Sequence, residues 1–161
     1  MKRSIPLFLI TVGLVVLLDQ ITKSLIVSNF LLHESMPVVD GLFNITYVRN
    51  PGAAFGFMSG ASPAFRGIFF SLVTLIAVSL ILYHLVKNRI ADPFLAFALA
   101  LVVAGALGNL LDRLRYGEVI DFLDVYISGY HWPAFNIADT AISIGAVFLI
   151  VEMVRRREPD I

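Results

Sequence analysis

Four long apolar segments, separated by polar or helix-breaking residues, limit the folds open to this chain more than any other feature. They cover about residues 5–27, 67–86, 93–111 and 137–154. A helix that crosses a bilayer needs about 17–25 mostly apolar residues. Only 15% of the residues are charged and 58% are hydrophobic, whereas about 25% are charged in soluble domains. We therefore expect one all-α membrane domain, residues 1–161, with four transmembrane helices.

The first segment has one feature of a cleavable signal peptide, because Lys2 and Arg3 precede its apolar run. A cleavage site would place small residues after that run. Asp19 and Gln20 stand there instead. We expect this segment to be a retained anchor.

Basic residues in short loops indicate the orientation of the spans, because Lys and Arg are enriched on the cytoplasmic side. One side would carry seven basic residues hard against span ends: Lys2, Arg3, Lys87, Arg89, Arg155, Arg156 and Arg157. The opposite side would carry five, which are Lys23, Arg49, Arg66, Arg113 and Arg115. We place the first side and both termini in the cytoplasm. The longer connections, about 28–66 and 112–136, then lie outside.

The first outer connection is too long for a simple turn. Its residues 36–48 contain two short apolar runs separated by Asp40 and Gly41, a pattern that predicts a small β-hairpin or sheet resting on the membrane. Residues 53–58 are apolar and aromatic and are expected in the membrane interface. We therefore expect a small β-rich subdomain outside the membrane.

Two ionisable residues stand near the outer end of the first span. Asp19 and Lys23 are four residues apart and share a helix face. Charged residues within a membrane usually pair with one another, and they also mark functional sites. The pair can therefore be a structural lock at the helix end or take a direct part in the chemistry.

The third span ends in a polar and glycine-rich stripe. Gly105, Gly108, Asn109 and Asp112 fall on one helical face. Small residues let another helix approach closely, so the stripe is expected to point inward. Asp112 can form a structural pair with Arg113 or serve an active role.

The fourth span begins with a second polar stripe, formed by Asn136, Asp139 and Ser143. Asn136 is also a good candidate for a helix cap. In the connection before it, Asp121 lies between Ile120 and Phe122 and is expected to return to the membrane surface. Asp124 is read as a solvated loop acid.

Asp19, Asp112, Asp121 and Asp139 are thus all expected near one face of the membrane. Two carboxylates that share a site hold one proton between them, and such a dyad can activate water and polarise a carbonyl. Other hydrolytic chemistries fit poorly, because the chain has no cysteine and its three histidines are scattered. The residues alone leave open which of these acids form the dyad.

Two other classes of function remain open at this point. Intramembrane carboxylates also serve proton relays, so a small proton- or ion-coupled carrier is the main alternative. Carrier sites usually lie near the bilayer midplane, whereas these acids gather at one face. A third possibility is a structural assembly subunit, in which the Asp/Lys and Asp/Arg pairs only hold helices together. That reading leaves Asp121 and Asp139 without a neighbouring cation.

Five sequence blocks, in order, carry a resemblance to a known family: residues 19–23 (DQITK), 50–55 (NPGAAF), 108–113 (GNLLDR), 119–122 (VIDF) and 135–139 (FNIAD). The chain resembles bacterial lipoprotein signal peptidase, also called signal peptidase II, over nearly its whole length. The resemblance implies an aspartic endopeptidase that removes the signal peptide from prolipoproteins. Cleavage would occur immediately before a cysteine that already carries a diacylglyceryl group.

The resemblance also implies roles for particular residues. The two catalytic aspartates of the family fall on Asp121 and Asp139. Asn50 and Arg113 correspond to substrate or inhibitor contacts. The shell that holds the dyad corresponds to Asp19, Lys23, Asn109, Asp112 and Asn136.

No metal or organic cofactor is implied. The expected partners are lipidated prolipoproteins and membrane lipid, with no nucleic acid, and the protein is expected to act as a monomer. The implied location is the bacterial cytoplasmic (inner) membrane, with the active site at its outer face.

Overall fold

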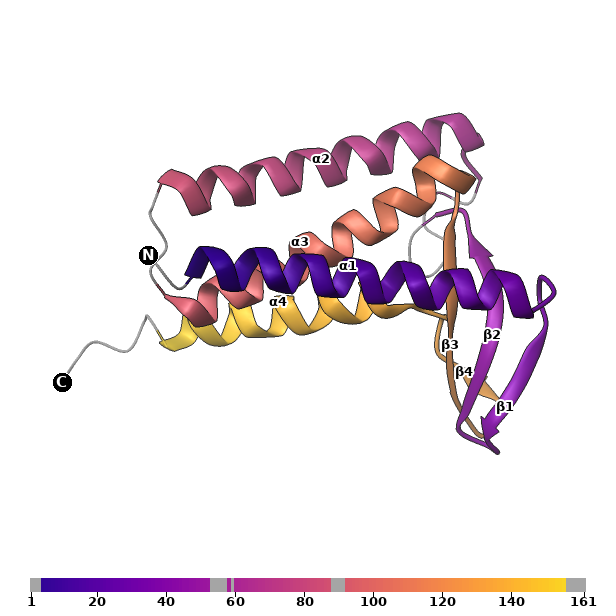
Figure 1. The fold of residues 1–161 in the computed structure, drawn as a ribbon. Coiled ribbons are helices and arrows are strands. Elements are labelled where there is room, and N and C mark those ends of the chain that lie inside the picture. Colours follow the sequence, from indigo (N-terminus) through magenta and orange to yellow (C-terminus); the bar gives the residue numbers. More distant parts are fainter. Residues whose placement is uncertain (1–3, 53–57, 59, 88–91, 156–161) are drawn as a thin grey trace.

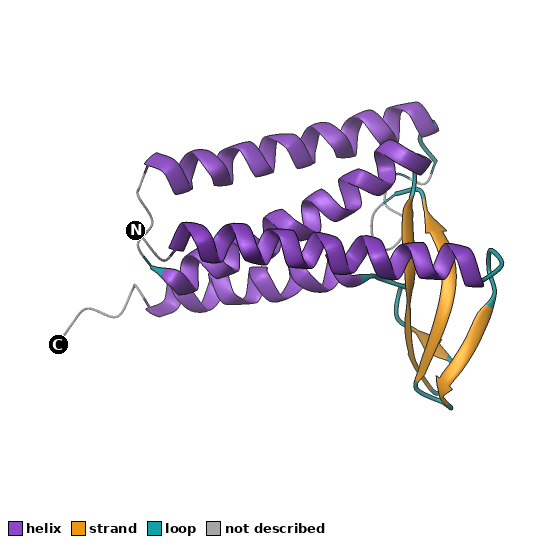
Figure 2. Ribbon diagram, viewed as in Figure 1, coloured by secondary structure: helices purple, strands orange, loops and turns teal. Residues whose placement is uncertain are grey.

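The computed structural model describes residues 4–52, 58, 60–87 and 92–155. The chain forms helices and strands in the following order (Figure 2): α1 (Ser4–Asn29), β1 (Ser35–Val39), β2 (Phe43–Asn50), α2 (Pro63–Lys87), α3 (Pro93–Tyr116), β3 (Val119–Ile127), β4 (Tyr130–His131) and α4 (Ile137–Arg155).

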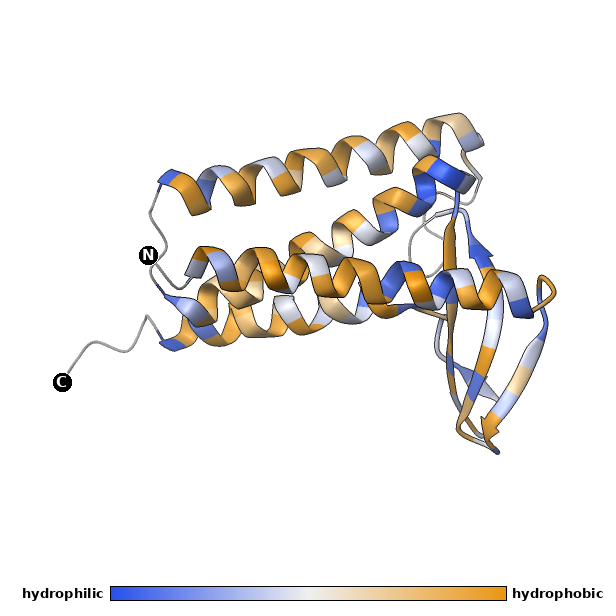
Figure 3. Ribbon diagram, in the orientation of Figure 1, coloured by the Kyte–Doolittle hydropathy of each residue, from blue (hydrophilic) through white to orange (hydrophobic). Residues whose placement is uncertain are grey.

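Four helices within the described residues are long and apolar enough to cross a membrane. They run side by side, and their apolar residues fill the middle of the bundle's length (Figure 3). Each helix covers one predicted span and extends past it by up to five residues, as α3 does to Tyr116. The expected fold class, four membrane-spanning helices with a small sheet, is confirmed.

Helix α3 forms the centre of the bundle and packs against α1, α2 and α4 (Figure 1). Its small residues Ala96, Ala98, Ala100 and Ala104 are fully buried. Small side chains let membrane helices approach closely, where dispersion contacts stabilise the pairing. Helix α2, in contrast, has no buried residue among those described and contacts only α3 of the other helices.

An antiparallel sheet lies across one end of the bundle, with strand order β1-β2-β3-β4 (Figure 1). The expected hairpin is confirmed as β1 and β2, which pair in register from Ser35 with Thr46. Both longer connections build this sheet, because β3 from the second connection pairs with β2 from the first. Ile26 of α1 packs with Tyr47, Ile120 and Phe122 in a core cluster that fastens the sheet to the bundle.

The segment 112–136, expected from the sequence only as a longer connection, contains the last turn of α3 and the strands β3 and β4. Helix α3 continues to Tyr116 and ends at Gly117, whose φ of 76° is left-handed and favours glycine. The Gly117 N–H donates to the Arg113 carbonyl, which closes the helix end. The chain then turns into β3 two residues later, and this turn brings the 119–122 block back over the bundle.

Ser4 and Arg155, the first and last described residues, lie at the end of the bundle away from the sheet (Figure 1). Several sequence-based expectations fall outside the described residues. They concern the basic residues Lys2, Arg3, Arg89, Arg156 and Arg157, most of the apolar segment 53–58 and the link 88–91.

Candidate active site

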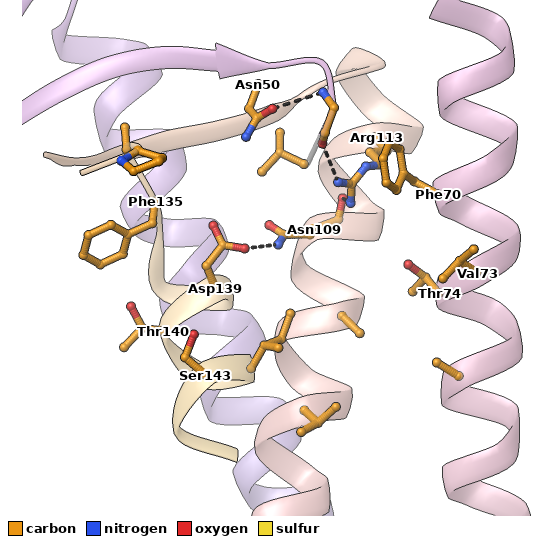
Figure 4. A pocket seen from close by; sticks show the side chains of 18 of the residues that line it. Asn50, Phe70, Val73, Thr74, Asn109, Arg113, Phe135, Asp139, Thr140 and Ser143 are labelled. Carbon is orange, nitrogen blue, oxygen red and sulfur yellow. Dashed lines mark hydrogen bonds between the residues drawn. The ribbon is translucent and has the colours of Figure 1, made fainter. Parts of the chain in front are cut away.

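A cavity of about 740 Å³ opens between α2, α3 and α4, close to the sheet. Most of its lining is apolar, and Figure 4 shows that its charged and amide side chains gather at the sheet end. These are Asn50, Asn109, Arg113 and Asp139. A pocket with mostly apolar walls and a few convergent polar groups is typical of a binding or catalytic site.

Asp139 lies in the first turn of α4 and projects into this cavity (Figure 4). Its Oδ1 accepts a hydrogen bond of 2.7 Å from the amide of Asn109 on α3. Its main-chain N–H donates to Oδ1 of Asn136 at 2.9 Å, so Asn136 caps α4 as the sequence suggested. The cap and the α3 amide together hold the Asp139 side chain at the cavity wall.

Asp121 lies on β3, and its side chain is 1% exposed. Its Oδ1 accepts from the amide of Asn136 at 2.7 Å, and its Oδ2 accepts from the amide of Asn50 at 2.9 Å. Asn136 therefore touches both acids, donating to the Asp121 carboxyl and accepting from the Asp139 main chain. Asp121 itself is buried and is not among the described residues that line the cavity.

The surroundings of Asp121 raise its pKa to about 7. Burial is the largest cause, because a desolvated carboxylate is unfavourable, and the nearby charge of Asp139 adds to it. The hydrogen bonds from Asn50 and Asn136, and the charge of Lys23, act in the opposite direction. Near neutral pH the Asp121 carboxyl is therefore present in both its protonated and its ionised form.

A buried ion-pair network lies behind the two acids. The ammonium of Lys23 is 2.9 Å from Asp19 and 2.8 Å from Asp112, and all three side chains are at most 2% exposed. Lys23 also donates to Oδ1 of Asn109 at 3.0 Å. Because Lys23 has no acceptor to offer, this bond fixes the amide orientation of Asn109, with its NH2 group turned toward Asp139.

Both carboxylates of this network also hold main-chain groups of the site. Asp19 accepts from the N–H of Ala138 at 2.9 Å, which satisfies one of the free donors at the start of α4. Asp112 accepts from the N–H of Ile120 at 3.1 Å, next to Asp121. The network therefore positions β3 and α4 relative to α1 and α3.

The structure does not bear out a pair between Asp112 and Arg113. Among the described ion pairs, Asp112 bonds Lys23 and not Arg113. Consecutive helical side chains project about 100° apart, so one turns inward and the other to the cavity. Arg113 instead donates to the carbonyl of Gly52 at 3.3 Å and stacks on the ring of Phe70, with its guanidinium carbon 4.8 Å from the centroid.

The reading of Asp124 as a solvated acid is also wrong. Its side chain is buried, accepts from the amide of Asn44 at 2.8 Å, and lies 2.8 Å from His131. These contacts join strand β3, which carries Asp124, to β2 and β4. The sequence does not predict these partners, because Asn44 is 80 residues from Asp124 and His131, 7 residues away, meets it only through the pairing of β3 with β4.

Sequence reasoning also gave no role to Gln20. Its amide donates to Asp112 at 3.0 Å and accepts from Arg115 at 2.9 Å. Its position next to Asp19, inside an apolar span, was the available signal. Among the described residues, no group of three or more His, Asp or Glu side chains is arranged to hold a metal ion.

Comparisons with known proteins agree with this architecture. Residues 11–155 match the family model described as Signal peptidase (SPase) II. The chain belongs to the signal peptidase II family. Membership makes the protein a peptidase, so the carrier and the structural subunit are both set aside.

Named relatives of this signal peptidase II chain share most of its length. It is 66% identical over 158 residues, 98% of both chains, to the lipoprotein signal peptidase of Syntrophus aciditrophicus. It is 54% identical to the one of Geobacter sulfurreducens, with 86% of this chain and 85% of the relative covered. A solved bacterial membrane enzyme, determined by the in meso method at 2.3 Å, superposes with a TM-score of 0.84. That match has 35% identity and covers 96% of this chain and 93% of the other.

Proposed function

We propose that this protein removes the signal peptide from diacylglyceryl-modified prolipoproteins by cleaving before the lipidated cysteine. The observation that carries the proposal is the pair Asp121 and Asp139, joined through Asn136 at the polar end of an apolar cavity. The relatives named above are lipoprotein signal peptidases. Two carboxyls that share a proton suffice for peptide hydrolysis without a covalent intermediate.

In the proposed reaction, Asp121 and Asp139 hold the attacking water between them. The ionised carboxylate takes a proton from the water, whose oxygen attacks the scissile carbonyl. The protonated carboxyl donates to the carbonyl oxygen as it becomes tetrahedral. Collapse re-forms the carbonyl and breaks the C–N bond, and the leaving amine of the lipidated cysteine takes up the proton that the first carboxylate removed from water, which returns the dyad to its one-proton state. The Asn50 amide donates to Oδ2 of Asp121, so in this reaction it releases that oxygen when the water binds.

The rest of the polar site serves binding and positioning in this proposal. Arg113 and Asn50 stand at the cavity and contact the substrate, as they would an inhibitor. Asp19, Lys23, Asn109, Asp112 and Asn136 hold the dyad in place. No metal or organic cofactor takes part.

We further propose the arrangement in the cell. The protein acts as a monomer and a single membrane domain in the bacterial inner membrane, with both termini in the cytoplasm. The sheet and the connections 28–66 and 112–136 lie at the outer face. A lipidated substrate could then keep its acyl chains in the outer leaflet while its signal helix enters between α2 and α4.

The test is cleavage of a diacylglycerylated prolipoprotein by the purified protein in detergent. Asp139→Asn should lower the rate by at least about 10³-fold, because the altered side chain can neither accept the proton of water nor share one. Its thermal unfolding should remain that of the wild type. Unlipidated substrate is the matched control and should stay uncut. Turnover near the wild-type rate in Asp139→Asn would contradict the dyad.

A further inference from the structure

Two hydroxyl groups lie in the otherwise apolar half of the cavity, away from the sheet. Thr74 projects from α2, and Ser143 projects from α4, into the space between those helices (Figure 4). Ser143 lies one helical turn beyond Asp139, and Thr74 lies one turn beyond Phe70. Both therefore stand deeper in the bundle than the dyad, on opposite walls of one cavity.

Neither hydroxyl forms a hydrogen bond with another residue that the structure describes. Thr140, between Asp139 and Ser143, shows the contrast, because its hydroxyl donates to the Asn136 carbonyl one turn back at 2.8 Å. Serine and threonine in membrane helices commonly satisfy themselves in this way. Hydroxyls without a partner in a hydrocarbon setting are costly, so Thr74 and Ser143 remain available to a ligand.

The chemistry of the reaction needs such groups at this depth. A peptide bond inside a helix is shielded, so a signal helix must unwind for a few residues before the bond that is cut. Unwinding frees main-chain N–H and C=O groups, and no water in the hydrocarbon region can satisfy them. A hydroxyl can both donate and accept, so it can satisfy either kind of group.

We propose that Thr74 and Ser143 bind the unwound main chain of the substrate on the signal-peptide side of the scissile bond. This inference rests on the proposed function and concerns the deep half of the same cavity. The hydroxyls of Thr74 and Ser143 bond the extended segment from opposite sides, and both bonds are to its main chain. Affinity at these positions would therefore depend little on which side chains the signal peptide carries.

The first test removes each hydroxyl while keeping the side-chain shape. Thr74→Val and Ser143→Ala should each lower kcat/KM for lipidated prolipoprotein about fivefold, since one hydrogen bond is lost. The loss should appear mainly in KM, and the pH profile should be unchanged because neither residue touches the dyad. Thr74→Ser should restore the activity lost in Thr74→Val. Ser79→Ala, which removes an exposed hydroxyl of α2 outside the cavity, should match the wild type.

The second test removes the partner group from the substrate. Synthetic lipidated substrates would carry an ester in place of one of the peptide bonds that precede the scissile bond. An ester lacks the N–H donor. At one of the positions tested, the ester should therefore lower the kcat/KM of the wild type about fivefold. The same ester should not lower kcat/KM further in Thr74→Val or in Ser143→Ala, because the hydrogen bond is already absent in that variant.

The outcomes separate this inference from the proposed function. Equal kcat/KM in the wild type, Thr74→Val and Ser143→Ala, with active wild type, would overturn the inference alone. Ester effects that stay the same in every variant would also overturn it. A folded wild-type protein that cleaves no lipidated substrate would contradict the proposed function and this inference together.

Discussion

Asn50 is the residue through which the pH dependence of the proposed reaction can be tested. Activity requires one shared proton, so kcat/KM should fall on the alkaline side near pH 7 as Asp121 loses its proton. The Asn50 amide lowers the pKa of Asp121 by bonding its carboxylate. Asn50→Ala removes that bond and should move the alkaline limb upward by about one pH unit. A hydrogen bond to a charged group contributes about 1.5 kcal/mol, which corresponds to roughly that shift.

A neighbouring asparagine on the same strand is the control for this pH profile. Asn44 donates to Asp124 and not to either acid of the dyad. Asn44→Ala should therefore leave the alkaline limb where it is in the wild type. An alkaline limb that stays in place, or moves to lower pH, in Asn50→Ala would refute the assignment of this limb to Asp121.

Lys23 is the residue on which the stability of the site depends most. It is the described cation closest to both Asp19 and Asp112, which are buried with it. Lys23→Met would leave two buried carboxylates without a counter-charge, and removing one partner of such a pair costs about 3–5 kcal/mol. Thermal unfolding in detergent should show a clearly lower midpoint.

Arg115→Gln provides the comparison for Lys23→Met. Arg115 is exposed and bonds only the Gln20 side chain among the described residues. Exposed pairs contribute about 0–1 kcal/mol, so this variant should unfold close to the wild-type temperature. Equal midpoints for the two variants would show that the buried network adds little to stability.

Among the elements, the contact between α3 and α4 decides whether the site can assemble. Gly105 faces α4 so closely that a Cβ there would meet the main-chain oxygen of Ala138 and the side chain of Ile142. Gly105→Ala should push the helices apart and lower stability by about 1–3 kcal/mol. Because α4 carries Asp139 and α3 carries Asn109, cleavage should fall as well.

A glycine elsewhere in the bundle separates this packing effect from helix propensity. A Cβ on Gly13 of α1 would meet nothing within 4 Å. Gly13→Ala should therefore leave the unfolding midpoint unchanged or raise it slightly, since alanine favours the helix by about 1 kcal/mol. If Gly105→Ala were as stable as Gly13→Ala, the close approach of α3 and α4 would not limit the fold.

The scale of elements also shows how far periodicity can predict a site. The stripe on α3 was predicted to face inward from its spacing and its small residues, and Asn109 and Asp112 do lie at or behind the cavity. The stripe on α4 was predicted only as a polar face, and its Asn136 and Asp139 lie at the same place. Asp121 was harder to place, because its environment depends on strand pairing with β2. That pairing joins residues 69 to 82 positions apart, from Asn50 with Val119 to Phe43 with Val125, and the acidic loop pattern does not encode it.

At the scale of the whole molecule, the proposed orientation can be tested with single cysteines, since the chain has none. Asp40→Cys lies in the exposed turn between β1 and β2. It should react with a membrane-impermeant maleimide added to intact spheroplasts. Lys87→Cys, at the opposite end of the bundle, should react only after the membrane is opened. The reverse pattern would invert the proposed topology.

The sequence by itself determined the class of this protein and its family. Four apolar spans and their basic flanks are local patterns that helix and membrane physics explain. Five blocks of polar residues carried the resemblance to the family. Only the tertiary structure decided which groups meet. Lys23 joins Asp19 to Asp112, Asn136 joins Asp121 to Asp139, and Thr74 faces Ser143 across the cavity. These contacts depend on the distance between helices that small residues permit and on the register of β2 with β3. Neither the distance nor the register can be predicted from the sequence of a single segment.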